Sequence, residues 1–428
     1  MTVIAELRMH APAAARPGWD ASRTVRLVLS GAVMFLLLVG ANLATPLYAG
    51  LQERLGYGSL GTTMAFASYV LALVGVLVTA GHWSDYVGRR AAMVLAVILG
   101  LAGSAVFASA GSLPALCGGR VLQGMAVGLA TGACAAALRE LLPQRPEWAS
   151  RFTLLASSGG VALGPVLGGA LAVLPGGPAV PFAVHALLLA VLLVPLVLVR
   201  ARPAALLPAG LVRTGVRPAR LLAPRSLRGA VPAGQARRTF WLAAATGFLS
   251  FARFGYQLAL SPAVFARVLG LGAPTALGAL AGLALATSAA SQLLVPGGRR
   301  RARRDSVLGL TALAVSVGVL AWGTTAGSAA ALILASAVAG AGQGVAFRAG
   351  FDAVASSVPA ERHAQTVSLL YVVTYLGSAV PVLGLGALAG AVGLGVAAPI
   401  FLLACSLAFG ALALLALRAL RAPRAAGA

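Results

Sequence analysis

Long stretches almost free of charged side chains constrain this chain more than any other feature. A helix that crosses the hydrocarbon core of a membrane needs about 20 apolar residues. The stretches are 27–52, 55–84, 91–119, 152–199, 239–266, 268–298, 306–347 and 363–417. Three of them are long enough for two spans each, with breaks at 175–178, near 324–328 and near 390–399. The stretch 91–119 holds the third span and the start of the fourth. Together the stretches predict twelve spans.

The composition excludes a soluble protein. Hydrophobic residues make up 60% of the chain and charged residues only 10%, and the mean hydropathy is +0.94. The runs lack the alternating pattern of barrel strands, and open sheets cannot cross lipid, so helices are expected. The predicted fold class is an all-α integral membrane protein.

The basic residues predict the orientation. All 32 are arginines, and 28 of them fall in alternate inter-span segments that include both termini. By the positive-inside rule both termini are cytoplasmic. The net charge of +23 is dispersed over these segments with few aromatic residues, which indicates contact with anionic lipid and no nucleic-acid partner. The abundance of Ala, Gly and Arg indicates a GC-rich genome, and we expect the plasma (inner) membrane of a bacterium.

One long polar interval divides the spans six and six. It contains nine arginines, five prolines and no acidic residue. Gln123-Gly124 recurs as Gln343-Gly344 at an offset of 220, and Pro165 recurs as Pro381 at an offset of 216, which indicates two pseudo-symmetric six-helix bundles. The predicted parts are a cytoplasmic tail (1–26), an N-terminal bundle (27–199), a cytoplasmic linker (200–238), a C-terminal bundle (239–419) and a second tail (420–428).

The loop after the second span carries the sequence GHWSDYVGRR, from Gly81 to Arg90. Here the chain resembles the major facilitator superfamily, whose signature in this loop is G-x-x-x-D-x-x-G-R-R/K. The resemblance implies a cytoplasmic latch formed by Gly81, Asp85, Gly88, Arg89 and Arg90. Gly88 is suited to a positive φ, and Asp85 to accepting hydrogen bonds from an arginine or a helix N-terminus. A plain charged loop is the simpler interpretation. The matching loop of the second half, Gly297 to Arg301, has no aspartate.

The fourth span contains Arg120-Val121-Leu122-Gln123-Gly124, which is similar to the R-x-x-x-G element of the same superfamily. In related proteins this arginine is associated with proton coupling or substrate contact. The resemblance therefore implies that Arg120 and Gln123 are candidate site residues. A charge inside a span costs a few kcal/mol, so it should face the protein interior or a wet cavity. The alternative is a structural arginine satisfied by carbonyl groups and nearby polar side chains.

The fifth span carries the sequence GVALGPVLGG from Gly160 to Gly169. It resembles the G-x-x-x-G-P-x-x-G-G element associated with drug/proton antiporters. The residues that match are Gly160, Gly164, Pro165, Gly168 and Gly169. Glycines at helical spacing form a flat face that a neighbouring helix can approach, and Pro165 favours a bend. A generic packing face is the other interpretation.

The resemblance places a substrate cavity between the first, fourth, seventh and tenth spans. The candidate lining residues there are Asn42, Tyr48, Arg253, Tyr256, Gln257 and Gln343, beside Arg120 and Gln123. Any one of them could instead make an ordinary interhelical hydrogen bond. All nine acidic residues fall outside the span centres. Two arginines within spans, without a buried partner acid, favour an anionic or strongly hydrogen-bonding neutral substrate.

His185 in the sixth span titrates near neutrality in water and is therefore a candidate proton carrier. A histidine hydrogen-bonded between helices is the favoured alternative. Asp85 and Glu140 could take part at the cytoplasmic rim. Cys117, Cys134 and Cys405 show no metal-binding spacing, so no metal or other cofactor is expected.

These features predict a transporter and no enzyme, because no P-loop sequence and no convergent catalytic set is visible. The expected function is export of a drug-like compound or metabolite by proton antiport, as a monomer by resemblance. Two alternatives stay open: an importer or uniporter of a nutrient on the same fold, and a non-transporting membrane sensor or scaffold.

Overall fold

The structure is a computed structural model that describes residues 18–81, 83–200, 230–270, 272–295, 298 and 301–421. Most of the predicted N-terminal tail, of the predicted linker and of the predicted C-terminal tail lies outside these residues. So do Gly297, Arg299 and Arg300 of the second inter-span cluster. The predicted part boundaries therefore stay predictions.

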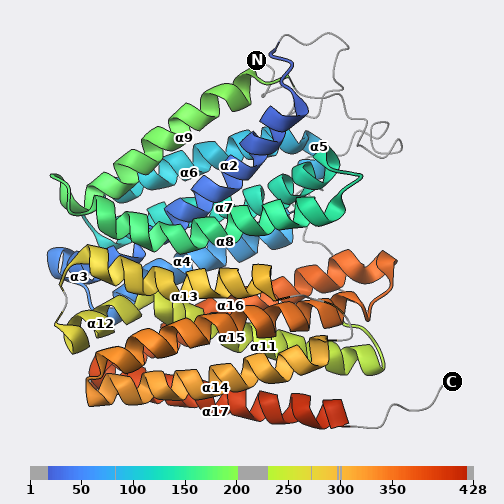
Figure 1. The fold of residues 1–428 in the computed structure, drawn as a ribbon. Coiled ribbons are helices and arrows are strands. Elements are labelled where there is room, and N and C mark those ends of the chain that lie inside the picture. The colour runs from blue at the N-terminus through green and yellow to red at the C-terminus, as the bar shows by residue number, and fades with distance from the viewer. Residues whose placement is uncertain are drawn as a thin grey trace. The chain divides into compact units, whose positions relative to one another are not determined.

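The described residues form helices joined by short turns, and Figure 1 traces them from blue to red along the chain. The elements are α2 (Arg23–Asn42), η1 (Thr45–Leu47), α3 (Tyr48–Leu55), α4 (Ser59–Thr79), α5 (Ser84–Val87), α6 (Arg89–Ala108), α7 (Leu113–Leu141), α8 (Pro146–Leu171), η2 (Gly177–Ala179), α9 (Val180–Leu198), α11 (Gln235–Ala259), α12 (Ser261–Leu269), α13 (Pro274–Leu294), α14 (Ala302–Ala326), α15 (Ala329–Ala355), α16 (Ala360–Val392) and α17 (Leu394–Arg421).

Twelve of these helices, in the described part of the chain, are at least 19 residues long. Eleven spans are long and apolar enough to cross a membrane, and the first of them joins α2, η1 and α3. The twelfth long helix, α11, is not among the eleven. Its first turn contains Arg237 and Arg238, and the buried Arg253 lies further along it. The helix count agrees with the twelve spans predicted from the charge-free runs.

The helices form two compact units, Met1–Leu55 with Met64–Ser226 and Gly56–Thr63 with Leu227–Ala428. In the first unit α6 packs against α7 and α9, and α2 packs against α7 and α8. In the second unit α15 packs against α13 and α14, α17 packs against α14, and α11 packs against α16 (Figure 1). The same order of partners therefore recurs: α2 with α8 corresponds to α11 with α16, and α6 with α7 corresponds to α14 with α15.

Local sequence defines where several helices begin and end. Ser22, Ser112 and Ser328 precede α2, α7 and α15, and each side-chain oxygen accepts a hydrogen bond from the backbone N–H three residues later. Gly327 ends α14 at a φ of +68°, a left-handed conformation that favours glycine. Ser328 then begins α15, so a two-residue turn joins two antiparallel helices.

Candidate functional site

The loop between α4 and α6 is organised around Arg89. Its Nη1 donates to Ser84 Oγ at 2.6 Å and to Asp85 Oδ1, and its Nε donates to Glu140 Oε1 at 3.0 Å. Nη2 also lies 2.9 Å from Glu140 Oε1. Arg89 thus connects the short helix α5, the start of α6 and the last turn of α7. The predicted partnership of Asp85 with an arginine is present, and Glu140 joins it.

Two positions of this loop require glycine for different reasons. Gly88 has a φ of +91° between α5 and α6, the left-handed conformation that the sequence predicts for it. A Cβ on Gly81 would lie 2.6 Å from Leu77 O, so a larger residue does not fit there without movement. The Gly81 carbonyl oxygen would itself lie 3.1 Å from a Cβ on Gly132 of α7. Gly81 is therefore where the loop lies close to α7.

Arg90 points away from this cluster and binds the C-terminal end of α9. Its Nε donates to Leu196 O at 2.9 Å, and its Nη2 donates to Val197 O. The last carbonyls of a helix lack intrahelical partners and carry partial negative charge, so an arginine there is stabilising. The two arginines therefore bind different helices: Arg89 binds α7, and Arg90 binds α9.

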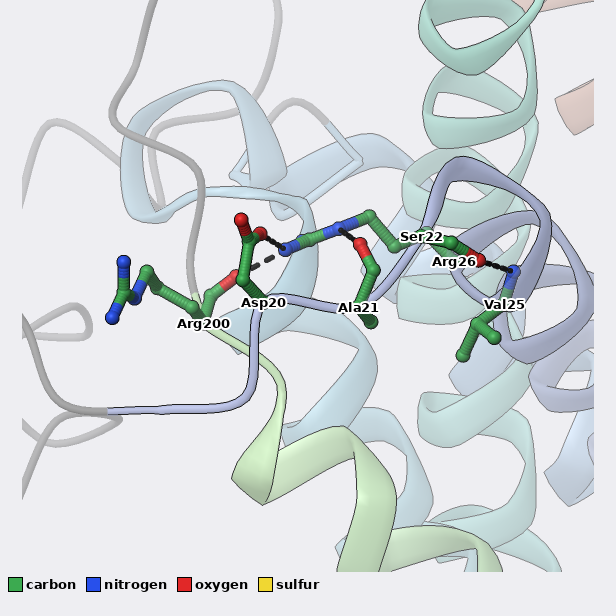
Figure 2. Close-up of polar contacts among 6 residues, drawn as sticks. All are labelled: Asp20, Ala21, Ser22, Val25, Arg26 and Arg200. Atoms are coloured by element: carbon green, nitrogen blue, oxygen red, sulfur yellow. Dashed lines mark hydrogen bonds and ion pairs between the residues drawn. The ribbon is translucent and has the colours of Figure 1, made fainter.

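The segment before α2 completes this cap on α9. Trp19 N donates to Leu198 O at 2.8 Å, and Arg200 N donates to Trp19 O at 2.7 Å. Figure 2 shows Arg26 donating to Arg200 O at 2.9 Å, to Ala21 O at 3.0 Å and to Asp20 Oδ1 at 3.4 Å. The start of the first span is thereby tied to the end of the sixth.

Arg120 is 1% exposed in the middle of α7. Its Nη1 donates to Ala41 O at 2.6 Å and to Gln123 Oε1 at 2.9 Å, and its guanidinium carbon lies 4.5 Å from the centre of the Tyr69 ring. Ala41 belongs to the last turn of α2, so its carbonyl is one that a helix end leaves available. These contacts are the ones expected of a structural arginine that is satisfied by carbonyl groups and nearby polar side chains. Arg120 Nε and Gln123 Nε2, however, are buried without a hydrogen-bond partner.

The candidates of the first span, Asn42 and Tyr48, form no hydrogen bond with this arginine. Asn42 is buried and donates to Leu38 O at 2.8 Å, the ordinary bond of a polar residue within its own helix. Tyr48 is buried at the start of α3, and its hydroxyl has no hydrogen-bond partner. Sequence reasoning missed Tyr69, because an aromatic residue in an apolar span gives no sign of the cation it faces.

His185 lies apart from Arg120, between α9, α6 and α2. It is 3% exposed, with Nδ1 at 2.8 Å from Ser104 Oγ and Nε2 at 2.9 Å from Leu36 O. A carbonyl can only accept, so Nε2 carries the proton and Nδ1 accepts from the serine hydroxyl. A Cβ on Gly40 would lie 2.1 Å from His185 Cε1, so α2 needs glycine where it crosses the ring. This is the geometry of a histidine hydrogen-bonded between helices.

The glycine motif of α8 faces α2 along its length. A Cβ on Gly160 would lie 2.5 Å from Phe35 O, one on Gly164 would lie 2.6 Å from Asn42 Cβ, and one on Gly168 would lie 2.2 Å from Leu43 O. Pro165 and Gly169 are buried in the same helix. The motif thus allows the backbones of two spans to approach so closely that no side chain fits between them.

The corresponding helix α16 has only one such glycine contact with α11 among the described residues. A Cβ on Gly377 would lie 2.1 Å from Phe248 O of α11, which repeats the relation of Gly160 to Phe35. Gly384 lies 216 residues after Gly168, and a Cβ on Gly384 would meet nothing within 4 Å. The two halves therefore share a packing scheme, but close approach over several turns occurs in the first.

In the second unit, Arg253 is completely buried on α11. Its Nη2 donates to Gln257 Oε1 at 3.2 Å, and its guanidinium carbon lies 5.6 Å from the Phe254 ring centre. Arg253 Nε, Arg253 Nη1 and Gln257 Nε2 are buried without hydrogen-bond partners. Tyr256 packs against Phe401 with ring centroids 6.1 Å apart, which is a core contact.

Gln343 of α15 is buried and is paired within its own unit. Its Oε1 accepts a hydrogen bond from Ser288 Oγ of α13. A Cβ on Gly344 would lie 2.1 Å from Ser291 Oγ, and one on Gly124 would lie 2.2 Å from Tyr69 O. The repeated Gln-Gly dipeptides therefore occupy equivalent places, each with its glycine against the second span of its own half, α4 for Gly124 and α13 for Gly344.

The second unit has its own arginine at a helix end. Arg348 of α15 donates to Val295 O at 2.8 Å and to Gln292 O, which are the terminal carbonyls of α13, and lies 4.0 Å from Asp352 Oδ2. From the sequence, the counterpart of the latch in the second half is expected at Gly297 to Arg301. The structure describes only Gly298 and Arg301 of this segment. Sequence reasoning missed Arg348 because no motif marks it. Within the described ranges no group of three His, Cys, Asp or Glu side chains could hold a metal.

A family model matches most of the chain. The model of the Major Facilitator Superfamily matches residues 30–380. The putative multidrug resistance protein MdtD of Klebsiella pneumoniae (strain 342) is 33% identical over 131 residues, which are 30% of this chain and 27% of that protein. MdtD of Salmonella typhi is 32% identical over 132 residues, again 30% of this chain and 27% of the relative. The chain thus matches about a quarter of the length of these curated relatives.

Solved structures resemble the chain over nearly its whole length. The human organic anion transporter MFSD10 has a TM-score of 0.65 at 19% identity, with 93% of this chain and 100% of that chain covered. A bacterial homolog of the human lysosomal transporter Spinster gives 0.72 at 14%, covering 94% and 98%. The nucleoside transporter NupG gives 0.70 at 13%, covering 93% and 99%. At these identities the likeness shows the fold, and it confirms the predicted all-α architecture.

Proposed function

The chain belongs to the major facilitator superfamily of membrane transporters, and we propose that it exports a small molecule by proton antiport with alternating access. It is a multi-pass membrane protein and a transporter, not an enzyme. The proposal adds the direction, the coupling ion and the residues involved. We also propose a monomer in the inner membrane of a bacterium, with both termini cytoplasmic.

The observation that carries the export direction is the contact of α8 with α2. Gly160, Gly164 and Gly168 all lie where a Cβ would overlap α2, and Pro165 interrupts the backbone hydrogen bonds of α8 in the same stretch. The sequence of this face resembles the antiporter element. The MdtD relatives, named as putative multidrug resistance proteins, support the same direction.

Buried polar groups support a substrate site in each unit. Arg120 with Gln123 in the first unit and Arg253 with Gln257 in the second leave N–H donors buried without acceptors. Buried polar groups are nearly always paired in a finished structure, so such donors mark places where a ligand or water binds. For the proton we propose the two carboxylates at the cytoplasmic rim, Asp85 and Glu140, which share Arg89 as a partner. His185, whose ring nitrogens bind Ser104 and Leu36 O on two other helices, is proposed to be structural.

An importer or uniporter on the same fold is the main rival, because one structural neighbour is named a nucleoside transporter. Inside-out membrane vesicles separate the two. Uptake of anionic, neutral and cationic compounds is measured with a proton gradient and again after an uncoupler is added. Gradient-dependent accumulation is expected for export. Uptake only in right-side-out vesicles would favour import, and binding without flux in proteoliposomes would favour a sensor or scaffold.

A further inference from the structure

One face of α11 carries a row of buried polar side chains. Ser250, Arg253 and Gln257 are spaced by three and four residues, so they lie on one stripe of the helix. All three are at most 1% exposed. Thr246, one turn before Ser250, is buried on the same stripe. A helix in lipid or in a protein core does not bury such a row without partners to satisfy it.

The hydrogen bond between Arg253 and Gln257 determines which groups are left over. Gln257 Oε1 accepts from Arg253 Nη2, so the amide oxygen is used and the amide NH2 faces elsewhere. The groups without partners are Arg253 Nε, Arg253 Nη1, Gln257 Nε2 and the Ser250 hydroxyl. The three nitrogens can only donate, and the hydroxyl can donate as well. The stripe therefore offers donors, and what completes it must accept.

The charge of the stripe is also uncompensated. Among residues whose side chains the structure describes, no carboxylate forms an ion pair with Arg253. A buried charge needs a counter-charge or several strong hydrogen bonds. An anion with oxygen acceptors supplies both, whereas a cation would add like charge and a neutral donor would leave the N–H groups unpaired.

Arg120 does not offer the same opportunity. Its Nη1 already bonds to Ala41 O and to Gln123 Oε1, and the Tyr69 ring lies over its guanidinium. Arg253 has one hydrogen bond, to Gln257, and two nitrogens without any. Of the two arginines, Arg253 therefore has the greater capacity for a ligand, with two buried nitrogens without hydrogen bonds against one in Arg120.

We propose that Arg253, Gln257 and Ser250 form the subsite for an anionic group of the transported molecule, and that this group is a single carboxylate. The proposal rests on the transporter function proposed above. Arg253 supplies the charge and two N–H donors, Gln257 supplies its amide N–H, and Ser250 supplies its hydroxyl. The oxygen of Gln257 holds the guanidinium in place. A dicarboxylate would bring a second charge for which this stripe has no counterpart.

Binding to the purified full-length protein tests the subsite without requiring transport. The probes are acetate, octanoate and benzoate, each compared with its neutral amide, and benzyltrimethylammonium as the cation. Affinity is measured from the concentration dependence of thermal stabilisation. At least one carboxylate is expected to stabilise the protein while its amide and the cation do not. Equal stabilisation by acid and amide, preference for the cation, or no binding of any carboxylate would overturn the proposal.

Variants assign the binding to the stripe. Arg253→Gln is expected to weaken carboxylate binding about tenfold or more, because a charged hydrogen-bond donor is lost. Arg253→Lys keeps the charge and should retain weaker binding, which separates loss of charge from loss of fold. Arg267→Gln removes a charge at the end of α12 and should bind like the parent protein. Unchanged binding by a folded Arg253→Gln protein would refute the assignment.

Flux in vesicles distinguishes failure of the subsite from failure of the proposed function. Proton-coupled export of neutral or cationic compounds with no carboxylate binding would leave the exporter standing and remove the subsite. Carboxylate binding that depends on Arg253 without any flux would leave the subsite standing and remove the exporter.

Discussion

Glu140 holds Arg89 through a single carboxylate oxygen, Oε1, which lies 3.0 Å from Arg89 Nε and 2.9 Å from Nη2. The other end of the same guanidinium contacts Asp85 and Ser84. Arg89 is therefore shared between an acid in its own loop and an acid on α7. Replacing either acid leaves the other in place.

A double-mutant cycle measures this coupling. Arg89→Gln and Glu140→Gln, alone and together, are expected to show an interaction of about 1 kcal/mol, because both side chains are only 22% exposed and two contacts link them. Unfolding in detergent gives the free energies. The pair Arg348 and Asp352, 4.0 Å apart and more exposed, is the matched control and should couple more weakly. Additive single variants at Arg89 and Glu140 would contradict the prediction.

The glycine face of α8 predicts opposite results at two related positions. Gly168→Ala is expected to destabilise the protein by about 1 to 3 kcal/mol, because its Cβ would lie 2.2 Å from Leu43 O and the backbone must move. Gly384→Ala is expected to be neutral or stabilising, since a Cβ there meets nothing within 4 Å and alanine favours the helix. Melting temperatures in detergent check both. Equal destabilisation at the two positions would be inconsistent with the packing.

His185 is predicted to be structural. His185→Ala should reduce stability by about 1 to 3 kcal/mol, because it leaves Leu36 O and Ser104 Oγ buried without this partner. Once the variant is folded, uncoupler-sensitive transport should persist at a comparable rate. Ser104→Ala is the control, since it removes one of the two bonds and should cost less. Transport that no longer responds to the proton gradient in His185→Ala would restore the histidine as a proton carrier.

Arg120 is predicted to tolerate no replacement, even by lysine. A lysine ammonium has neither the planar shape nor the reach to contact Ala41 O and Gln123 Oε1 while covering the Tyr69 ring. Transport in vesicles should fall about tenfold or more in Arg120→Lys, consistent with the loss of at least about 1.4 kcal/mol.

Tyr69→Leu is the companion variant for Arg120. It removes only the ring beneath the guanidinium, a contact worth about 0.5 to 2 kcal/mol, and should retain part of the activity. Full activity of Arg120→Lys would show that charge alone is sufficient.

The fold could be predicted from the sequence because charges and turn residues interrupt the apolar runs. The predicted breaks at Pro175–Pro178 and near 324–328 coincide with η2 and with the turn at Gly327. The latch could be predicted in part. The motif indicated Asp85 and Gly88, and it indicated an arginine as a partner for Asp85. Which arginine depends on the break in the helix at Gly88, which separates α5 from α6.

The contacts of the arginines could not be predicted. Arg120, Arg90 and Arg348 all bind carbonyl oxygens at the C-terminal ends of other helices. Every residue carries a carbonyl, so a backbone acceptor leaves no mark in the sequence, and only the packing of helices brings it to a side chain. The pairing of each buried arginine with a glutamine one turn away was visible as spacing, but which end of the amide faces the guanidinium was not.

The cap on α9 has a consequence for how the first half is made. Arg26 bonds to Arg200 O across 174 residues of sequence, and Trp19 exchanges backbone hydrogen bonds with the strand-like residues around Val199. During synthesis the segment before the first span therefore lacks its partners at the end of α9 until all six spans of its half have been made, and only its local bonds to α2 can form earlier. Contacts between residues so distant in sequence are slow to form, so joining these two ends should be among the last steps of assembly. Until then we expect the segment before α2 to be more accessible to added protease than in the finished protein.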